Sequence, residues 1–162
     1  MTGSGESSPS KVYLALRVPA SPERAFEVFT AEIGAWWQPD DLFRITSRGD
    51  GQLRFEPGAG GRLVATFEDG EVFEIGRVSV WDPGRRLVFS WRQQSFPAGR
   101  ETEVEVRFEP AGDETRVSLE HRAWDRVPRR SAARHGFPDA VTLEHVARWW
   151  RRSLRCMHET AF

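Results

Sequence analysis

The chain has 162 residues, 39% of them hydrophobic, and a formal net charge of −1, which fits one domain with one core. A charge this close to zero excludes a global field that would attract nucleic acid, so we expect no nucleic-acid partner. Cys156 is the only cysteine, which excludes an internal disulfide and a cysteine metal cluster and fits a reducing cytoplasm. No apolar run reaches membrane length and no signal-peptide core is present, so we expect no membrane insertion.

The N-terminal part begins with a Gly/Ser-rich stretch, residues 1–10, which predicts a disordered tail before a single domain at 11–162. Alternating apolar residues then predict a strand over 12–18. Ser21, Pro22 and Glu23 are typical of a helix start, with Ser21 as the N-cap. The short helix that follows should be broken in two by Gly34, and Trp36-Trp37 comes just after it.

The middle of the chain predicts six further strands separated by turn signals, over residues 53–55, 63–67, 71–81, 87–92, 101–109 and 115–121. Gly76 lies inside the third of these and indicates a β-bulge. Each strand alternates apolar and polar residues, which is typical of an antiparallel sheet with one covered face. The two short helices near the N-terminus are too small to cover such a sheet.

One long amphipathic helix, Pro138–His158, should therefore close the sheet. Its apolar residues recur at steps of three and four and share one face: Leu143, Val146, Ala147, Trp150, Leu154 and Met157. Asp139 is the predicted N-cap of this helix, because its carboxylate can accept from the free N–H groups of the first turn. The predicted fold class is thus α+β.

The element order resembles the helix-grip fold of the START-like (SRPBCC) superfamily, and most closely its branch named after the activator of the heat-shock-protein-90 ATPase. The residues that carry the resemblance, in chain order, are Pro22-Glu23, Phe26, Phe29, Trp36-Trp37, Gly60-Gly61-Arg62, Gly76, Val78, Asp82-Pro83, Leu87, Trp91, Thr115, Val117, Leu119 and His121. The resemblance covers roughly residues 11–154. One departure is Gly136-Phe137-Pro138, which stands where the family usually has a Gly-Trp pair.

This resemblance implies a curved antiparallel sheet of about seven strands wrapped around the long C-terminal helix, with two short helices after the first strand. It also implies a pocket between sheet and helix. Members of the superfamily bind lipids, polyketides, plant hormones and other apolar molecules, and some act as cyclases or hydrolases. We therefore expect a small apolar ligand as partner, whereas no protein partner can be named.

The candidate ligand-binding residues are the aromatic side chains expected to face inward together with one histidine: Trp37, Phe55, Phe67, Phe73, Phe89, Trp91, His121 and Trp150. For each aromatic residue the alternative is plain core packing. The Trp36-Trp37 pair is either a gate at the pocket mouth or a hydrophobic plug. His121 shares strand parity with Leu119, so it is either a weak candidate for a catalytic base or a structural histidine.

Other chemistry finds little support in the sequence. Arg62 either anchors an anionic ligand group or forms a surface ion pair. The four histidines lack the spacing of a metal site, so we expect neither a metal nor a cofactor. The leading hypothesis is binding of a hydrophobic ligand in an internal cavity. The alternatives are a cyclase or dehydratase of a polyketide-like substrate on the same scaffold, and a chaperone-binding module.

Overall fold

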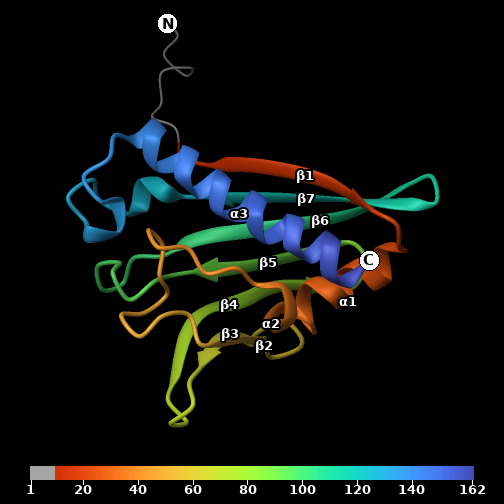
Figure 1. The fold of residues 1–162 in the computed structure, drawn as a ribbon, viewed down its shortest axis with the longest axis horizontal. Helices are drawn as coiled ribbons and strands as arrows, with labels where there is room; N and C mark the ends of the chain where they lie inside the picture. Colours follow the sequence, from red (N-terminus) through yellow and green to blue (C-terminus); the bar gives the residue numbers. More distant parts are fainter. Residues whose placement is uncertain (1–9) are drawn as a thin grey trace, which may run out of the picture.

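A computed structural model describes residues 10–162 and contains a seven-stranded sheet in the order β1-β7-β6-β5-β4-β3-β2, with every neighbouring pair antiparallel (Figure 1). The strands are β1 Val12–Val18, β2 Gln52–Phe55, β3 Arg62–Thr66, β4 Val72–Asp82, β5 Arg86–Trp91, β6 Thr102–Ala111 and β7 Glu114–Arg122. The seven predicted strands are confirmed, with ends that move by one or two residues.

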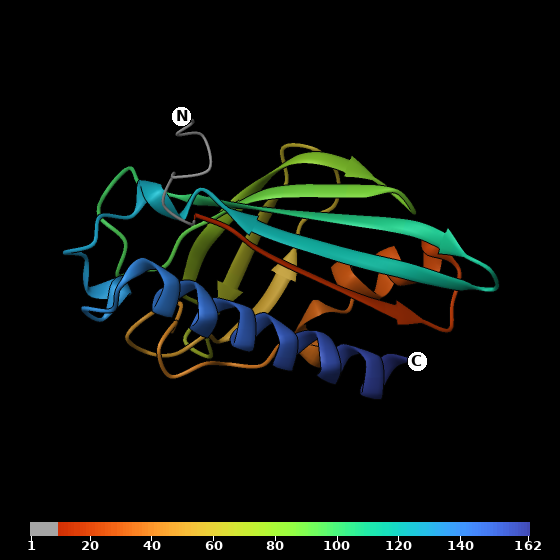
Figure 2. The same cartoon turned by 90° about the horizontal axis from the view of Figure 1, so that it is seen from above.

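The helices lie on one side of this curled sheet, and α3 runs along its concave face (Figure 2). They are α1 Pro22–Thr30, α2 Ile33–Trp36 and α3 Asp139–Ala161, with two 3-10 turns, η2 Trp124–Arg126 and η3 Ala132–Arg134. The α+β helix-grip fold is therefore confirmed. The core fills the space between the concave face and α3.

The start of α1 agrees with the prediction, because the Ser21 side chain accepts from Arg24 N and Pro22 is the first helical residue. The predicted break at Gly34 is wrong, since the break falls at 31–32 and Gly34 lies inside α2. Gly34 is needed for close packing instead. A Cβ at this position would lie 2.1 Å from the Gln52 amide nitrogen and 3.0 Å from the Leu53 carbonyl oxygen.

The predicted N-cap of α3 is also wrong. Pro138 occupies that position, and Asp139 is the first helical residue. The Asp139 carboxylate accepts from Arg129 and from Arg134, at 2.8 and 2.9 Å. The Asp139 carboxylate thus accepts hydrogen bonds from two arginines of the preceding loop and does not cap the backbone N–H groups of the first turn.

The buried face of α3 is wider than the predicted stripe. The predicted apolar residues are buried except Ala147, which is half-buried, and three further residues join them: Thr142, Trp149 and Ser153. These positions are spaced by seven and four residues, so they extend the same face. Trp149 and Trp150 both point into the core, and both are fully buried.

The predicted irregularity at Gly76 is present. The register of β3 on β4 jumps from Gly76 to Glu74 between Leu63 and Val64, which leaves Ile75 as the extra residue. The bulge brings Glu74 and Arg77 to one face, where their side chains pair at 3.2 Å.

The other face of the sheet carries an ion-pair network centred on Glu105 in β6. Its carboxylate accepts from Arg122 at 2.6 Å and from Arg86 at 2.7 Å. Burial raises the pKa of Glu105, but these hydrogen bonds outweigh burial and hold the pKa at about 2.

The predicted tail, residues 1–10, lies outside the described residues except for Ser10, whose carbonyl accepts from Trp124 N at 3.0 Å. Within residues 10–162, no helix has the length and apolar character required to cross a membrane.

Candidate functional site

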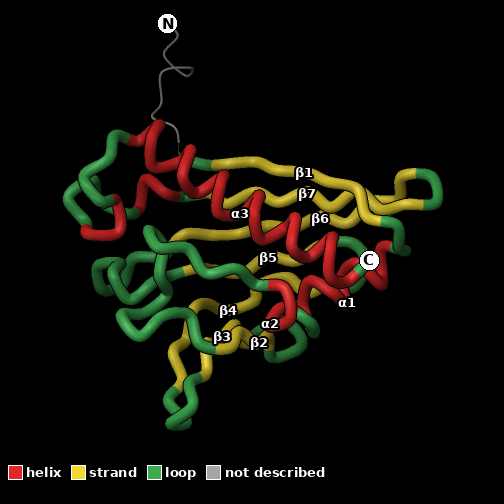
Figure 3. Tube along the Cα trace, viewed as in Figure 1, coloured by secondary structure: helices red, strands yellow, loops and turns green. Residues whose placement is uncertain are grey.

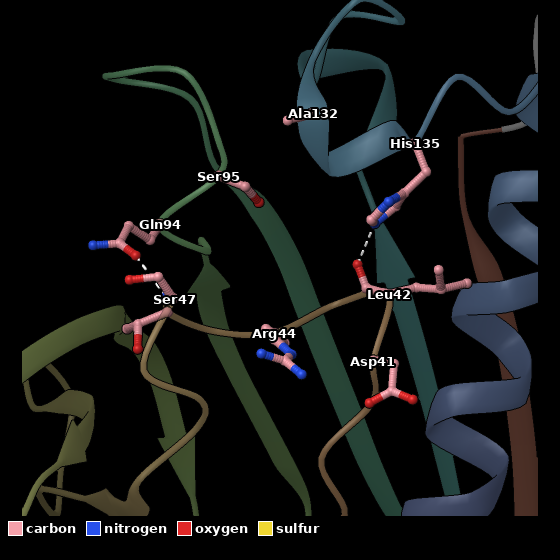
Figure 4. A pocket seen from close by; sticks show the side chains of 9 residues that line it. Asp41, Leu42, Arg44, Ser47, Gln94, Ser95, Ala132 and His135 are labelled. Atoms are coloured by element: carbon pink, nitrogen blue, oxygen red, sulfur yellow. Dashed lines mark hydrogen bonds between the residues drawn. The ribbon is translucent and has the colours of Figure 1, made fainter.

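Three long loops meet at one end of the sheet (Figure 3). They are the segments 37–51, 92–101 and 123–138, which follow α2, β5 and β7. A pocket of about 380 Å³ lies between them (Figure 4). Its lining residues are Asp41, Leu42, Arg44, Thr46, Ser47, Gln94, Ser95, Ala132 and His135. We call this the mouth pocket.

Hydrogen bonds hold the first of these loops in place. Asp50 is buried, and its carboxylate accepts from Trp37 Nε1 at 2.8 Å and from Ile45 N at 3.0 Å. The His135 ring hydrogen-bonds the Leu42 carbonyl across the mouth pocket (Figure 4). Residues 41–47 are therefore tied both to the tryptophans below them and to the loop above.

Five tryptophans lie beneath the mouth pocket, and we call them the tryptophan cluster: Trp37, Trp91, Trp124, Trp149 and Trp150. Trp149 contacts Trp37, Trp91 and Trp150 with ring centroids 5.3 to 5.6 Å apart. The space where the resemblance implies a deep pocket is thus occupied by indole rings.

Phe43 connects the cluster to the mouth pocket. Its ring stacks on Trp149 at 5.2 Å and meets Trp124 at 6.0 Å. It also meets the ring of His135, which lines the pocket, at 6.2 Å. Phe43 therefore separates the pocket from the tryptophans, and a displacement of its loop would expose them.

His121 lies fully buried within this cluster, and both of its ring nitrogens are occupied. Trp150 Nε1 donates to Nδ1 at 2.9 Å, which places the neutral ring's proton on Nε2. Nε2 lies 2.7 Å from Thr102 Oγ1, and that hydroxyl donates onward to the Trp91 carbonyl. Burial lowers the pKa of His121 to about 3. These contacts favour the structural interpretation over a catalytic base.

Four buried polar atoms in the described part of the chain have no hydrogen-bond partner, and all belong to this end of the core. They are the indole nitrogens of Trp91, Trp124 and Trp149 and the Oε1 atom of Gln93. Gln93 is 1% exposed, and its amide nitrogen donates to the Arg44 carbonyl at 3.2 Å. Buried polar groups are normally paired, so four unpaired atoms in one region need an explanation.

The other predicted ligand-binding residues lie elsewhere. Phe55 and Phe89 are buried and pack on each other at 5.2 Å, but neither contacts a ring of the tryptophan cluster. Phe67 and Phe73 are half-buried beneath the guanidinium groups of Arg48 and Arg92, each 4.6 Å from the ring centre. The structure therefore brings together Trp37, Trp91, His121 and Trp150 only.

Sequence reasoning missed Phe43, Gln93, Trp124 and Trp149. Trp149 could have been found, because it lies seven residues after Thr142 and four before Ser153 on one helix face. The other three lie in loops or a 3-10 turn, where no periodic pattern marks a buried residue.

Two arginines differ in what they offer an anionic group. Arg62 forms a bidentate pair with Glu56, at 3.0 and 2.7 Å, which supports the ion-pair interpretation. The hydrogen bonds from Arg62 lower the pKa of Glu56 to about 2. Arg44 lines the mouth pocket, is exposed, and has no ion pair within residues 10–162. The same residues contain no group of three side chains suited to hold a metal ion.

Arg134 fixes the loop that forms the upper wall of the mouth pocket. Its side chain is 4% exposed, pairs with Asp139 at 2.9 Å, and donates to the carbonyls of Trp124 and Val127. We expect Arg134→Ala to lower the free energy of unfolding by about 3 kcal/mol, because the buried carbonyls of Trp124 and Val127 lose their donor and Asp139 keeps only Arg129. Arg129→Ala, which removes an exposed partner of Asp139, should cost less than about 1 kcal/mol. Urea denaturation of both variants tests this, and equal losses would contradict it.

A family model for "Activator of Hsp90 ATPase homolog 1-like protein" matches residues 19–160, which is most of the chain. The chain belongs to this family. A search of curated proteins found no match.

Solved structures agree with this assignment. Protein CV1439 from Chromobacterium violaceum has a TM-score of 0.61 at 18% identity, over 93% of this chain and 96% of its own. An HSP90 activator from Plasmodium falciparum, PFC0360w, has a TM-score of 0.59 at 18% identity, over 88% of each chain. The anthrahydroquino-γ-pyrone synthase Txn09 has a TM-score of 0.58 at 30% identity, over 94% of this chain and 97% of its own. The first two show the fold, and the third is also similar in sequence.

Proposed function

We propose that the protein binds a small, mostly aromatic molecule at the mouth pocket and the tryptophan cluster beneath it. The observation that carries the proposal is the group of unpaired buried atoms on Trp91, Gln93, Trp124 and Trp149. Three indole N–H groups offer donors to a carbonyl or phenolate oxygen, and Gln93 Oε1 offers an acceptor to a hydroxyl. A planar ligand with oxygen substituents would satisfy them while its rings stack on indoles.

Access to these atoms requires Phe43 and its loop to move. The loop is held at its outer edge by contacts with His135 and Gln94, both of which lie at the mouth pocket. Arg44 on the same loop would then offer an unpaired guanidinium to an anionic substituent. Because the chain has a single cysteine and therefore no internal disulfide, we expect the protein to function in the reducing cytoplasm.

Blocking the mouth tests the proposal with 1,8-dihydroxyanthraquinone as the probe. Ala132→Phe places a ring in the mouth pocket, and we expect at least about tenfold weaker binding of the probe, measured by quenching of tryptophan fluorescence. Ala98→Phe is the matched control, because Ala98 is exposed but does not line the pocket. Equal binding to the wild type and both variants would contradict entry through this mouth.

A second candidate function is a ring-closing enzyme on the same site, favoured by the 30% identity to the γ-pyrone synthase over nearly the whole of both chains. His121 is poorly suited to proton transfer there, since both ring nitrogens are engaged. Asp41 and His135 line the pocket and are the acid–base candidates. No observation favours the chaperone-binding hypothesis, because the large exposed hydrophobic residues in the described part, Tyr13, Val72 and Val141, lie on three different elements.

The enzyme candidate is tested with a hydroxyanthraquinone that carries an ortho 1,3-diketone side chain. Attack of its phenol oxygen on the distal ketone, followed by loss of water, closes a γ-pyrone ring. Chromatography should show product only when protein is present, with less product for His135→Ala and an unchanged amount for His145→Ala. Product formation at the uncatalysed rate would remove this candidate while leaving ligand binding intact.

A further inference from the structure

We propose that a groove between β1 and α3 binds an acidic, extended segment of a partner protein. The groove holds about 340 Å³. Its floor includes Leu14, Leu16 and Leu154, and its rim includes Arg151, Arg155 and His158. It lies along the C-terminal half of α3, whereas the mouth pocket lies before the N-terminal end of that helix. The proposal is therefore independent of the proposed ligand site.

The backbone of β1 favours a strand-like occupant. β1 is the last strand of the sheet order and pairs only with β7, so its outer N–H and C=O groups have no strand partner among the described residues. An edge strand can be covered by a helix, and α3 packs beside β1 but leaves the groove between them. Within the strand itself, the usual protection is a charged side chain, proline or a bulge. The central residues Tyr13–Leu16 carry none of these, and the register of β1 on β7 is unbroken. An extended segment could add to this edge through main-chain hydrogen bonds.

The charge on the rim favours an acidic occupant. Arg151 and Arg155 are exposed, lie one helical turn apart, and have no ion pair within residues 10–162. Their neighbour Arg152, on the other side of the helix, pairs with Asp40 at 3.1 Å. Glu159 also lies at the rim but forms no ion pair with either arginine within residues 10–162. Two unneutralised cations beside an open edge match carboxylates on an added strand.

A second copy of this chain fits the groove less well. Pairing of β1 with β1 across a two-fold axis would bring the same arginines of both copies toward one another. That approach of like charges opposes association. A free anion or an anionic lipid would satisfy the arginines but would leave the edge of β1 unused.

The test uses a fluorescein-labelled peptide of alternating glutamate and valine, with fluorescence anisotropy as the readout. We expect binding by the wild type and at least about tenfold weaker binding by R151E/R155E. R100E/R126E is the matched control, since both arginines are exposed, unpaired and distant from the groove, and it should bind like the wild type. Amide NMR resonances of residues 13–16 should shift when the peptide is added.

Two further probes decide the kind of occupant. A peptide of the same sequence, N-methylated on every residue so that neither edge can donate a main-chain hydrogen bond, should fail to bind; binding at equal strength would overturn strand addition. Absence of binding by the glutamate–valine peptide at millimolar concentration would overturn the proposal. So would arginine-dependent binding to phosphatidylglycerol vesicles alone, or a concentration-dependent dimer that R151E/R155E dissociates.

Discussion

Gly76→Ala should lower the free energy of unfolding by about 3 kcal/mol or more, or prevent folding altogether. A Cβ at Gly76 would lie 1.7 Å from the Ser90 carbonyl oxygen and 2.5 Å from its carbon. Neither atom belongs to a flexible side chain, so β4 and β5 would have to separate at the bulge. Urea denaturation followed by circular dichroism measures the loss.

Gly112→Ala is the control for this substitution. Gly112 has a φ of 66°, and a Cβ added there would have no atom within 4 Å, so alanine costs only backbone strain, about 1 kcal/mol. A loss at position 76 no larger than the loss at position 112 would contradict the close approach of the two strands.

Acidification from pH 7 to pH 4.5 should lower the free energy of unfolding by about 2.5 kcal/mol through His121 alone. The pKa of His121 is about 3 in the folded protein, against 6.5 in its unperturbed state. Between these values the unfolded chain binds more protons than the folded chain, so stability falls as the pH falls. Protonation would also remove the acceptor that His121 Nδ1 offers to Trp150.

The pH range of the experiment separates the contribution of His121 to stability from the contributions of the paired carboxylates. Glu56 and Glu105 have pKa values of about 2 in the folded protein, so their contributions are lost only below about pH 4.5. His121→Gln keeps an acceptor for Trp150 and a donor for Thr102 but does not titrate. Its free energy of unfolding should change little between pH 7 and pH 4.5. If the free energy of unfolding of this variant fell with pH as steeply as that of the wild type, His121 would not be buried as a neutral ring.

The positions of the strands along the chain could be predicted because apolar and polar residues alternate within them and turn residues separate them. The prediction for Gly34 is wrong because a long-range contact, the packing of β2 on α2, decides that position. The prediction for Asp139 is wrong because Pro138 takes the N-cap, while the Asp139 carboxylate pairs with Arg134, five residues earlier. No local pattern marks the first contact, and the second depends on how the loop before α3 folds.

The candidate site could be predicted only in part, for a similar reason. The two-residue repeat of the strands places Trp91 and His121 on the concave face, and the helical repeat of α3 turns Trp150 toward it. Neither repeat predicts where along the sheet a side chain lies. Phe73 pairs with the buried residue Ala65 and therefore has the right parity, yet it lies near the strand end beneath Arg92. Phe43 and Gln93 lie in loops, so only the folded chain shows that they connect the mouth pocket to the tryptophans.

The indole N–H resonances of ¹⁵N-tryptophan-labelled protein, followed during titration with 1,8-dihydroxyanthraquinone, show whether a ligand binds among the indole rings. We expect shifts at Trp91, Trp124 and Trp149, whose indole nitrogens have no partner in the described structure. Trp81 lies outside the tryptophan cluster and packs on Phe26, so its resonance should stay in place. Shifts confined to Trp81, or none in the three cluster resonances at saturating probe, would contradict a ligand site at this end of the core.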